Sequence, residues 1–199
     1  VRDLERAAEV AAGHWILWGP EMTGGGHLPG GLYYWLLAIP LRLGMGWKGA
    51  WVLICLLWVA ASAAAGFLLA RAYGSLAALL AAAYFFLPIA VLQNFLNVSA
   101  TPPFIVAALA GISLAFTSAE EKNRARGWAA ACLATGLGVQ LHFSMAILLV
   151  AGFALWFGAP ILRLQRPATK SFGKGVALHL IPLAPYLAHR SEEHTSELQ

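Results

Sequence analysis

Long apolar runs, separated by short polar segments, constrain this chain more than any other feature of its sequence. The runs cover residues 50–70, 75–92, 104–118 and 128–162. Hydrophobic residues make up 60% of the 199-residue chain and charged residues only 11%, whereas about 25% of an ordinary soluble domain is charged. So few charges cannot cover a soluble surface, which excludes a disordered chain, a nucleic-acid-binding module and most cytosolic enzymes. We therefore expect an all-α polytopic membrane protein.

Residues 1–49 differ in composition from the rest of the chain. They contain a charged segment with helical periodicity (1–12), a loop rich in Gly and Pro (13–31) and an apolar, aromatic segment (32–43). The last segment is too short to span a membrane, which takes about 20 residues, and its aromatic start is typical of the membrane interface. We interpret residues 1–49 as an outward-facing first loop with an amphipathic and an interfacial helix.

The apolar runs that follow predict a bundle of transmembrane helices. Residues 50–189 have room for about five to six spans of membrane-crossing length. Within the longest run, Gln140 and His142 interrupt the apolar pattern. We expect that run to form two helices joined by a tight turn near residues 141–144.

Basic residues indicate which ends of the spans face the cytoplasm. If successive spans alternate in direction, Arg71 shares one side with the charged segments 119–127 and 163–174, and that side carries eight Lys and Arg against four on the other. The positive-inside rule places the eight-cation side in the cytoplasm. The segments that then face outward are 1–49, 93–103 and 140–144.

Both ends of the sequence are expected to be truncations. Residue 1 is Val, and residues 190–199 switch abruptly to polar residues after an apolar helical pattern. The same ten-residue peptide results from translating a common sequencing-adapter oligonucleotide. We therefore interpret residues 190–199 as an assembly artefact, with a genuine polar tail as the alternative.

Polar side chains gather in the outward-facing segments, and a polar group near the membrane usually lines a cavity or pathway. Among them, Asp3 and Glu5 precede the long loop. A positioned carboxylate can accept the proton of an attacking hydroxyl or amine, so both are candidate catalytic residues. The alternative for either carboxylate is a place on the solvated face of an amphipathic helix.

The other candidates are substrate-binding residues: His27, Tyr33, Tyr34, Asn97, Gln140 and His142. Either histidine could bind a phosphate or an acceptor hydroxyl. His142 fits equally well as a residue at a helix end that is hydrogen-bonded to the backbone. The two tyrosines could shape the mouth of a groove or anchor the chain at the interface.

Metal-binding and nucleotide-binding motifs are missing from the sequence. It has no HExxH or CxxC pattern, and its triple glycine is not followed by the Lys-Ser/Thr of a P-loop. We expect no cofactor, with a divalent metal ion left open, and no nucleic-acid partner.

Three outward-facing segments, in order, resemble one enzyme family. They are His27-Leu-Pro-Gly-Gly-Leu-Tyr-Tyr-Trp-Leu-Leu37, Gln93-Asn-Phe-Leu-Asn97 through Pro102-Pro103, and Val139-Gln-Leu-His-Phe-Ser144. They resemble segments of GT-C membrane glycosyltransferases, most closely bacterial glycosyltransferase family 39 and its relatives, which include protein mannosyltransferases. Gly31 stands where that family often has a second proline.

The resemblance implies transfer of a sugar from a polyprenyl-phosphate donor to a lipid, glycan or protein acceptor, at the outer face of the bacterial inner membrane. It implies a GT-C-like helix bundle, here truncated at both ends. Asp3 matches the position of the family's catalytic Asp, which is often followed by Glu; here Leu4 follows and Glu5 comes one residue later. A fragment without the helices that complete the donor groove is expected to be inactive alone.

A polytopic transporter or channel subunit is the alternative from another class. Transporters usually carry polar or broken-helix sites near the bilayer midplane. The spans predicted here are polar mainly at their outer ends, which favours the glycosyltransferase.

Overall fold

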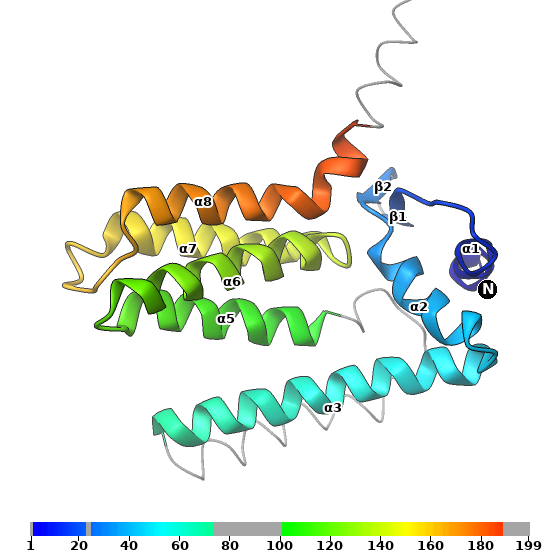
Figure 1. The fold of residues 1–199 in the computed structure, drawn as a ribbon, viewed down its shortest axis with the longest axis horizontal. Coiled ribbons are helices and arrows are strands. Elements are labelled where there is room, and N and C mark those ends of the chain that lie inside the picture. Colours follow the sequence, from blue (N-terminus) through cyan, green and yellow to red (C-terminus); the bar gives the residue numbers. More distant parts are fainter. Residues whose placement is uncertain (1, 23–24, 74–100, 189–199) are drawn as a thin grey trace, which may run out of the picture. The chain divides into compact units, whose positions relative to one another are not determined.

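The computed structural model of this chain describes residues 2–22, 25–73 and 101–188, and its described elements are mainly helical (Figure 1). The chain divides into two units: Val1–Trp15 with Tyr33–Val106, and Ile16–Leu32 with Ala107–Gln199. The helical part of the expected fold class is therefore confirmed. The predicted span 75–92 lies outside the described residues.

In the first unit, helix α1 (Arg2–Ala11) agrees with the helical periodicity of residues 1–12. Its end is fixed by hydrogen bonds from the Gly13 N–H to the Val10 carbonyl and from the His14 N–H to the Glu9 carbonyl. Together these form a Schellman motif, in which the residue after the helix adopts a left-handed conformation. Gly13 has φ +102°, which a residue without Cβ adopts at low cost.

Helices α2 (Leu32–Arg42) and α3 (Gly46–Tyr73) complete the described elements of the first unit, apart from the start of α5. The first shows that the segment 32–43 is helical, while its interfacial position stays a prediction, and the second contains the predicted span 50–70. Ala7 of α1 is fully buried, as are Tyr33 and Leu37 of α2.

Residues 13–31 are not all loop, and that prediction was wrong for part of the segment. Strands β1 (Trp18–Glu21) and β2 (His27–Pro29) form an antiparallel hairpin, with Trp18 opposite Pro29 and Glu21 opposite His27. The two strands were hard to predict from the sequence because they are very short. They also contain Pro20 and Pro29, and strands usually avoid proline.

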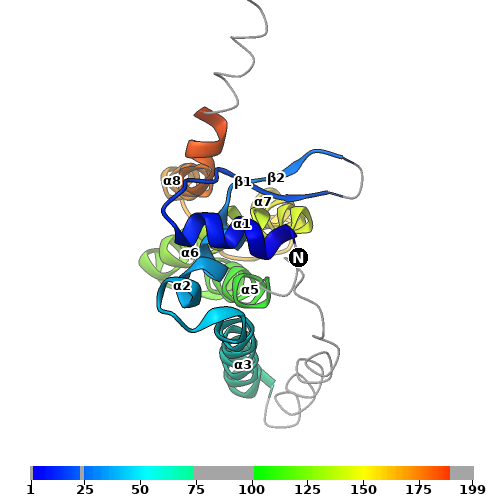
Figure 2. The ribbon, with the colours of Figure 1, turned by 90° about the vertical axis from the view of Figure 1, so that its right-hand side faces the viewer.

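The second unit contains this hairpin and the helices α5 (Pro102–Thr117, from Ala107 on), α6 (Glu121–Val139), α7 (Ala146–Gly158) and α8 (Thr169–Leu180). The 3₁₀ turns η3 (Phe143–Met145) and η4 (Ile181–Leu183) precede α7 and follow α8. The helices run side by side in Figure 1 and are seen end-on in Figure 2.

The predicted break in the run 128–162 agrees with the structure, because α6 ends at Val139 and α7 begins at Ala146. The charged segment 119–127, which was expected to connect two spans, is helical from Glu121 onward, where α6 begins. The pair Glu121 and Arg124, an ion pair of 3.0 Å at helical spacing, was the missed signal.

Trp128 occupies the centre of the second unit. It is 1% exposed, stacks on Phe172 at a centroid distance of 4.8 Å and donates its Nε1 hydrogen to the Phe172 carbonyl. Gly152 of α7 and Gly175 of α8 leave the room that this indole fills, since a Cβ on either would collide with it. Gly152 and Gly175 therefore fix the position of the Trp128 indole.

Within the described residues, no helix combines the length and apolar character that a membrane span requires. The polytopic part of the expected fold class stays a prediction.

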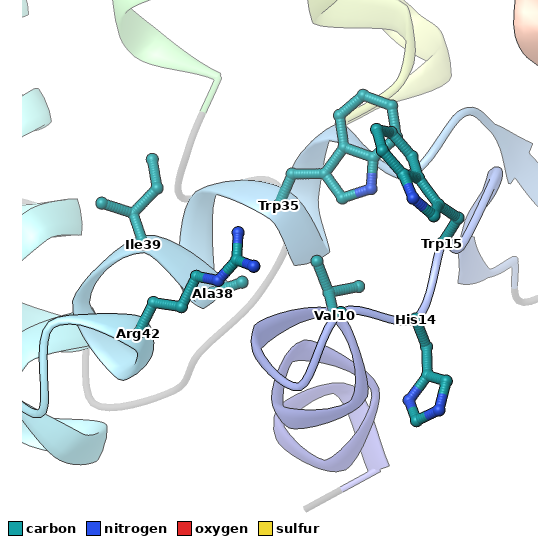
Figure 3. A pocket seen from close by; sticks show the side chains of 8 residues that line it. Val10, His14, Trp15, Trp35, Ala38, Ile39 and Arg42 are labelled. Carbon is teal, nitrogen blue, oxygen red and sulfur yellow. The ribbon is translucent and has the colours of Figure 1, made fainter.

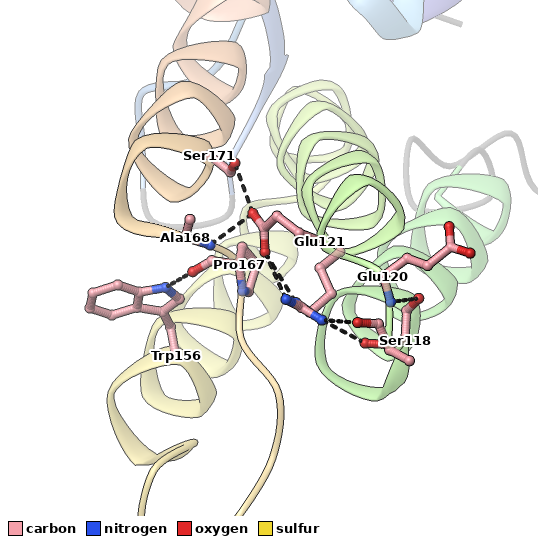
Figure 4. Close-up of polar contacts among 9 residues, drawn as sticks. Ser118, Glu120, Glu121, Trp156, Pro167, Ala168 and Ser171 are labelled. Carbon is pink, nitrogen blue, oxygen red and sulfur yellow. Dashed lines mark hydrogen bonds and ion pairs between the residues drawn. The ribbon is translucent and has the colours of Figure 1, made fainter.

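Glu121 links α6 to the start of α8 (Figure 4). Its Oε1 accepts hydrogen bonds from the Ala168 N–H at 3.0 Å and the Ser171 hydroxyl at 3.1 Å, while its Oε2 accepts from Arg124. The Ala168 N–H bond is the main cause that lowers the pKa of Glu121, with Ser171 and Arg124 adding to it. Arg124 in turn donates to the carbonyls of Ser118 and Ala119, so one carboxylate connects three helix ends.

We expect Glu121→Gln to lower the melting temperature by a few degrees, and by more than Glu120→Gln, whose carboxylate bonds only Asn123 among the described residues. A lowered folded-state pKa means that ionised Glu121 stabilises the protein above the ordinary carboxyl pKa, and that this stabilisation disappears as pH falls through the folded-state value. Thermal unfolding of the two variants from pH 7 down to pH 3 measures this. Equal melting temperatures for both variants at pH 7 would contradict it.

Candidate functional site

Asp3, the predicted catalytic carboxylate, is held by a tyrosine from the next helix. Its Oδ1 accepts a hydrogen bond of 3.1 Å from the Tyr34 hydroxyl, across 31 positions of sequence. Asp3 is half-buried in the first turn of α1, and Tyr34 is 3% exposed. Burial, and then the charge of Asp3, raise the pKa of Tyr34, so the phenol stays protonated and donates.

Tyr33 lies beside this pair, with its ring centroid 5.8 Å from that of Tyr34. It is fully buried, and its hydroxyl has no hydrogen-bond partner among the described residues. Burial, and then the charges of Asp3 and Tyr34, raise the pKa of Tyr33. A buried hydroxyl without a partner is costly, so the Tyr33 hydroxyl is an exception to the usual pairing of buried polar groups.

The second predicted carboxylate, Glu5, is exposed on α1. Its neighbours Arg6 and Glu9 form an exposed ion pair of 2.9 Å on the same helix. The structure therefore brings Asp3, Tyr33 and Tyr34 together and leaves Glu5 on the surface of α1.

His27 and Gln140 belong to the second unit. His27 is exposed, with its Nδ1 3.1 Å from the Gly19 carbonyl oxygen across the hairpin. Gln140 is 2% exposed and donates from Nε2 to the Pro182 carbonyl at 2.9 Å, while its Oε1 has no partner among the described residues.

Gly30 is a residue that the sequence interpretation passed over, although the Gly30-Gly31 doublet was a visible signal. It has φ +89°, and a Cβ at this position would collide with the Gln140 side chain. The hairpin therefore packs against the end of α6 through a glycine and a buried amide.

His142 has the geometry of the helix-end residue considered as its alternative. It is the N-cap of η3, where its Nδ1 accepts a 3.3 Å hydrogen bond from the Ser144 N–H and lies 2.6 Å from the Ser144 hydroxyl. Asn97, the remaining candidate, lies outside the described residues. Residues 2–22, 25–73 and 101–188 contain no group of three or more His, Cys, Asp or Glu side chains that could hold a metal ion.

The described elements are mainly helical, and a carboxylate and two tyrosines of the first two helices lie together. The family model for dolichyl-phosphate-mannose-protein mannosyltransferase matches residues 30–189. The chain belongs to this family, and it is a GT-C type mannosyltransferase-like chain. No curated protein and no solved structure matches it.

Family membership indicates a glycosyltransferase whose donor is a polyprenyl-phosphate-linked sugar and whose acceptor is a glycan or a protein. Members of the family are membrane proteins. The transporter alternative has no support from these findings. The matched residues include Tyr33, Tyr34, Gln140 and His142 but begin after Asp3, Glu5 and His27.

We expect Gly30→Ala to destabilise the protein more than Gly25→Ala. Gly25 has nearly the same φ, +87°, but open space around it, so its substitution carries only the strain of a left-handed residue, about 1–2 kcal/mol. The additional loss at Gly30 measures the collision with Gln140. Thermal unfolding of both variants tests this, and Gln140→Ala in the Gly30→Ala background should recover part of the difference. Identical melting temperatures for the two single variants would show that the contact is unimportant.

We expect Tyr34→Phe and Tyr33→Phe to differ in kinetics. Tyr34→Phe removes a hydrogen bond to a carboxylate, and bonds of this kind are worth about 1.5–3 kcal/mol, so kcat should fall by roughly 10- to 150-fold. Tyr33→Phe removes a hydroxyl with no described partner, so the melting temperature should not fall, while KM should rise several-fold. Steady-state kinetics with the intact enzyme measures both. An unchanged KM for Tyr33→Phe would exclude its hydroxyl from substrate binding.

Proposed function

We propose that this chain is part of an enzyme that transfers a sugar from a polyprenyl-phosphate donor to a lipid, glycan or protein acceptor at the outer face of the bacterial inner membrane. Asp3 is the residue that accepts the proton of the acceptor group. The hydrogen bond between Asp3 and Tyr34 is the observation that carries this proposal.

The geometry around Asp3 supports a role as a base. Tyr34 occupies Oδ1 at 3.1 Å, which orients the carboxylate and leaves Oδ2 for an acceptor hydroxyl. The unpartnered Tyr33 hydroxyl lies in the same cluster and supplies a second polar contact for that group. A base must lie within hydrogen-bond reach of the proton it takes, and a fixed carboxylate satisfies that requirement when the acceptor binds.

The proposed reaction is a single displacement at the anomeric carbon. The acceptor oxygen forms a bond to that carbon while the bond from carbon to the donor phosphate oxygen breaks. The electron pair of the broken bond leaves with the phosphate, which departs ionised and needs no general acid. The acceptor proton moves to Asp3, and no cofactor takes part in this step.

His27 and His142 are the proposed contacts for the donor phosphate, together with Asn97 and Gln140 as further substrate-binding residues. Each histidine engages Nδ1 locally, one with the Gly19 carbonyl and the other with Ser144. Nδ1 of His142 accepts a hydrogen bond, so its Nε2 carries the hydrogen and can donate to a phosphate oxygen. Nδ1 of His27 donates to the Gly19 carbonyl, so its Nε2 can donate to a phosphate only from the imidazolium form. A hydrogen-bond donor directed at the developing negative charge stabilises the transition state.

Exposed apolar side chains support the proposal that the enzyme lies in a membrane. Large apolar side chains lie exposed along α3, including Leu56 at 60% and Phe67 at 61%, and along α7, including Ile147 at 66% and Phe157 at 68%. Large exposed apolar patches mark surfaces that contact a membrane or another protein. A lipid environment is the occupant expected for a member of this family.

We expect Asp3→Asn to lower kcat for sugar transfer by about 10²–10⁴-fold, the usual worth of general-base catalysis, with a much smaller change in KM. Glu9→Gln is the matched control, because Glu9 lies on the same helix and makes only a surface ion pair with Arg6. The measurement is transfer from a polyprenyl-phosphate sugar in membranes that contain equal amounts of each intact variant.

Near-normal transfer by Asp3→Asn would end the proposed role of Asp3. The exposed carboxylate of Glu5 would then be tested in the same way. Loss of activity in both Asp3→Asn and Glu9→Gln would point to damage to α1 rather than to a lost base.

A further inference from the structure

A pocket lies between α1 and α2 (Figure 3). It extends along α2 from Trp35 in the first turn to Arg42 in the last turn. Val10, Trp15, Trp35, Ala38, Ile39 and Arg42 line its apolar wall and its basic edge, and its volume is about 380 Å³. Small-molecule pockets usually measure about 300–1,000 Å³ and are mostly apolar with a few polar groups. We refer to it as the α1–α2 pocket.

The wall of the α1–α2 pocket exposes side chains that a soluble protein would bury. Trp15 is 82% exposed and meets Trp35 edge-to-face at a centroid distance of 6.0 Å, and Ile39 is 51% exposed. Two tryptophans at one site are typical of the headgroup level of a membrane, where an apolar ring with a polar N–H is stable. The wall therefore fits a hydrocarbon chain near its headgroup.

Arg42 supplies a charge at this pocket that no described group neutralises. Among residues 2–22, 25–73 and 101–188, it forms no ion pair or hydrogen bond. An Arg in the last turn of a helix often caps the final carbonyls, but those of Ile39, Pro40 and Leu41 already accept the N–H groups of residues 43, 45 and 44. In Figure 3 its guanidinium lies on the same side of α2 as Ala38, whereas the His14 ring points away from both tryptophans.

We propose that the α1–α2 pocket binds an anionic phospholipid of the surrounding membrane, with the phosphate at Arg42 and an acyl chain against Trp15 and Trp35. An Arg guanidinium forms paired hydrogen bonds with a phosphate, which matches the single cation of the pocket. The apolar wall favours a lipid over free phosphate, because free phosphate would leave the wall exposed to water.

The phosphate end of this lipid site is separate from the proposed catalytic cluster, whereas Trp35 at its other end directly follows Tyr34 in the sequence. Val10 lies seven residues after Asp3 along α1, and Arg42 lies eight residues after Tyr34 along α2, so at 1.5 Å per residue each separation is roughly 10–12 Å. The bound lipid would fix the α1–α2 pair at the membrane surface. The proposal does not depend on the identity of the transferred sugar or on a catalytic role for Asp3.

The test uses the intact protein in micelles of an uncharged detergent, titrated with a short-chain phosphatidylglycerol and followed by native mass spectrometry. Arg42→Gln should weaken the Kd by about tenfold or more, as expected for losing charge-assisted hydrogen bonds. Arg42→Lys should retain part of the affinity. Lys48→Gln is the matched control, because it removes an exposed cation that does not line the pocket. Trp15→Ala should also weaken lipid binding. Because the Trp15 side chain is highly exposed, this substitution should leave the fold intact.

Three results would overturn the proposal. Equal affinities for wild type and Arg42→Gln would remove Arg42 from the site. Equal affinities for phosphatidylglycerol and uncharged diacylglycerol of the same chain length would show that charge plays no part. Displacement of the lipid by millimolar inorganic phosphate would show an anion site without a chain-binding wall. Asp3→Asn should bind the lipid like wild type, so this test and that of the catalytic base can fail independently.

Discussion

Close approach of helices at small residues is the constraint on which the second unit depends. Gly111 and Gly127 bring the backbones of α5 and α6 so near that a Cβ on either would strike the other helix. Gly152 and Gly175 leave space for the Trp128 indole, whose Nε1 then reaches the Phe172 carbonyl. In a membrane, hydrophobic burial no longer drives helices together, and packing at small residues takes over that role. These contacts are the kind that a helix bundle surrounded by lipid requires.

The first unit differs because polar groups are buried where its first two helices meet. Ala7 of α1 is fully buried, and the buried phenol of Tyr34 donates to Asp3 on the same helix. This hydrogen bond restricts the orientation of the carboxylate. A fixed orientation suits the proposed role of Asp3 as a base that points at an incoming hydroxyl.

Local patterns predicted the local structure, whereas contacts between distant residues could not be predicted. The periodicity of residues 1–12 and the interruption at Gln140 and His142 identified α1 and the end of α6, because both signals lie within a few residues. The pairing of Asp3 with Tyr34 spans 31 positions and leaves no local trace. Gly30 and Gln140 lie even farther apart in the sequence, although the glycine itself was visible. The hairpin was missed because its strands, of four and three residues, are too short to show an alternating pattern.

The α1–α2 pair carries two different kinds of chemistry, and the difference follows from its sequence. Where Tyr34 meets Asp3, an acidic and a phenolic group lie together, with the Tyr33 ring beside them. In the α1–α2 pocket, Trp15 and Trp35 form an apolar wall, and Arg42 is a cation that pairs with no group among the described residues. Under the two proposals, the first place binds an acceptor hydroxyl and the second binds the phosphate of a membrane phospholipid, so each place takes the ligand that suits its charge.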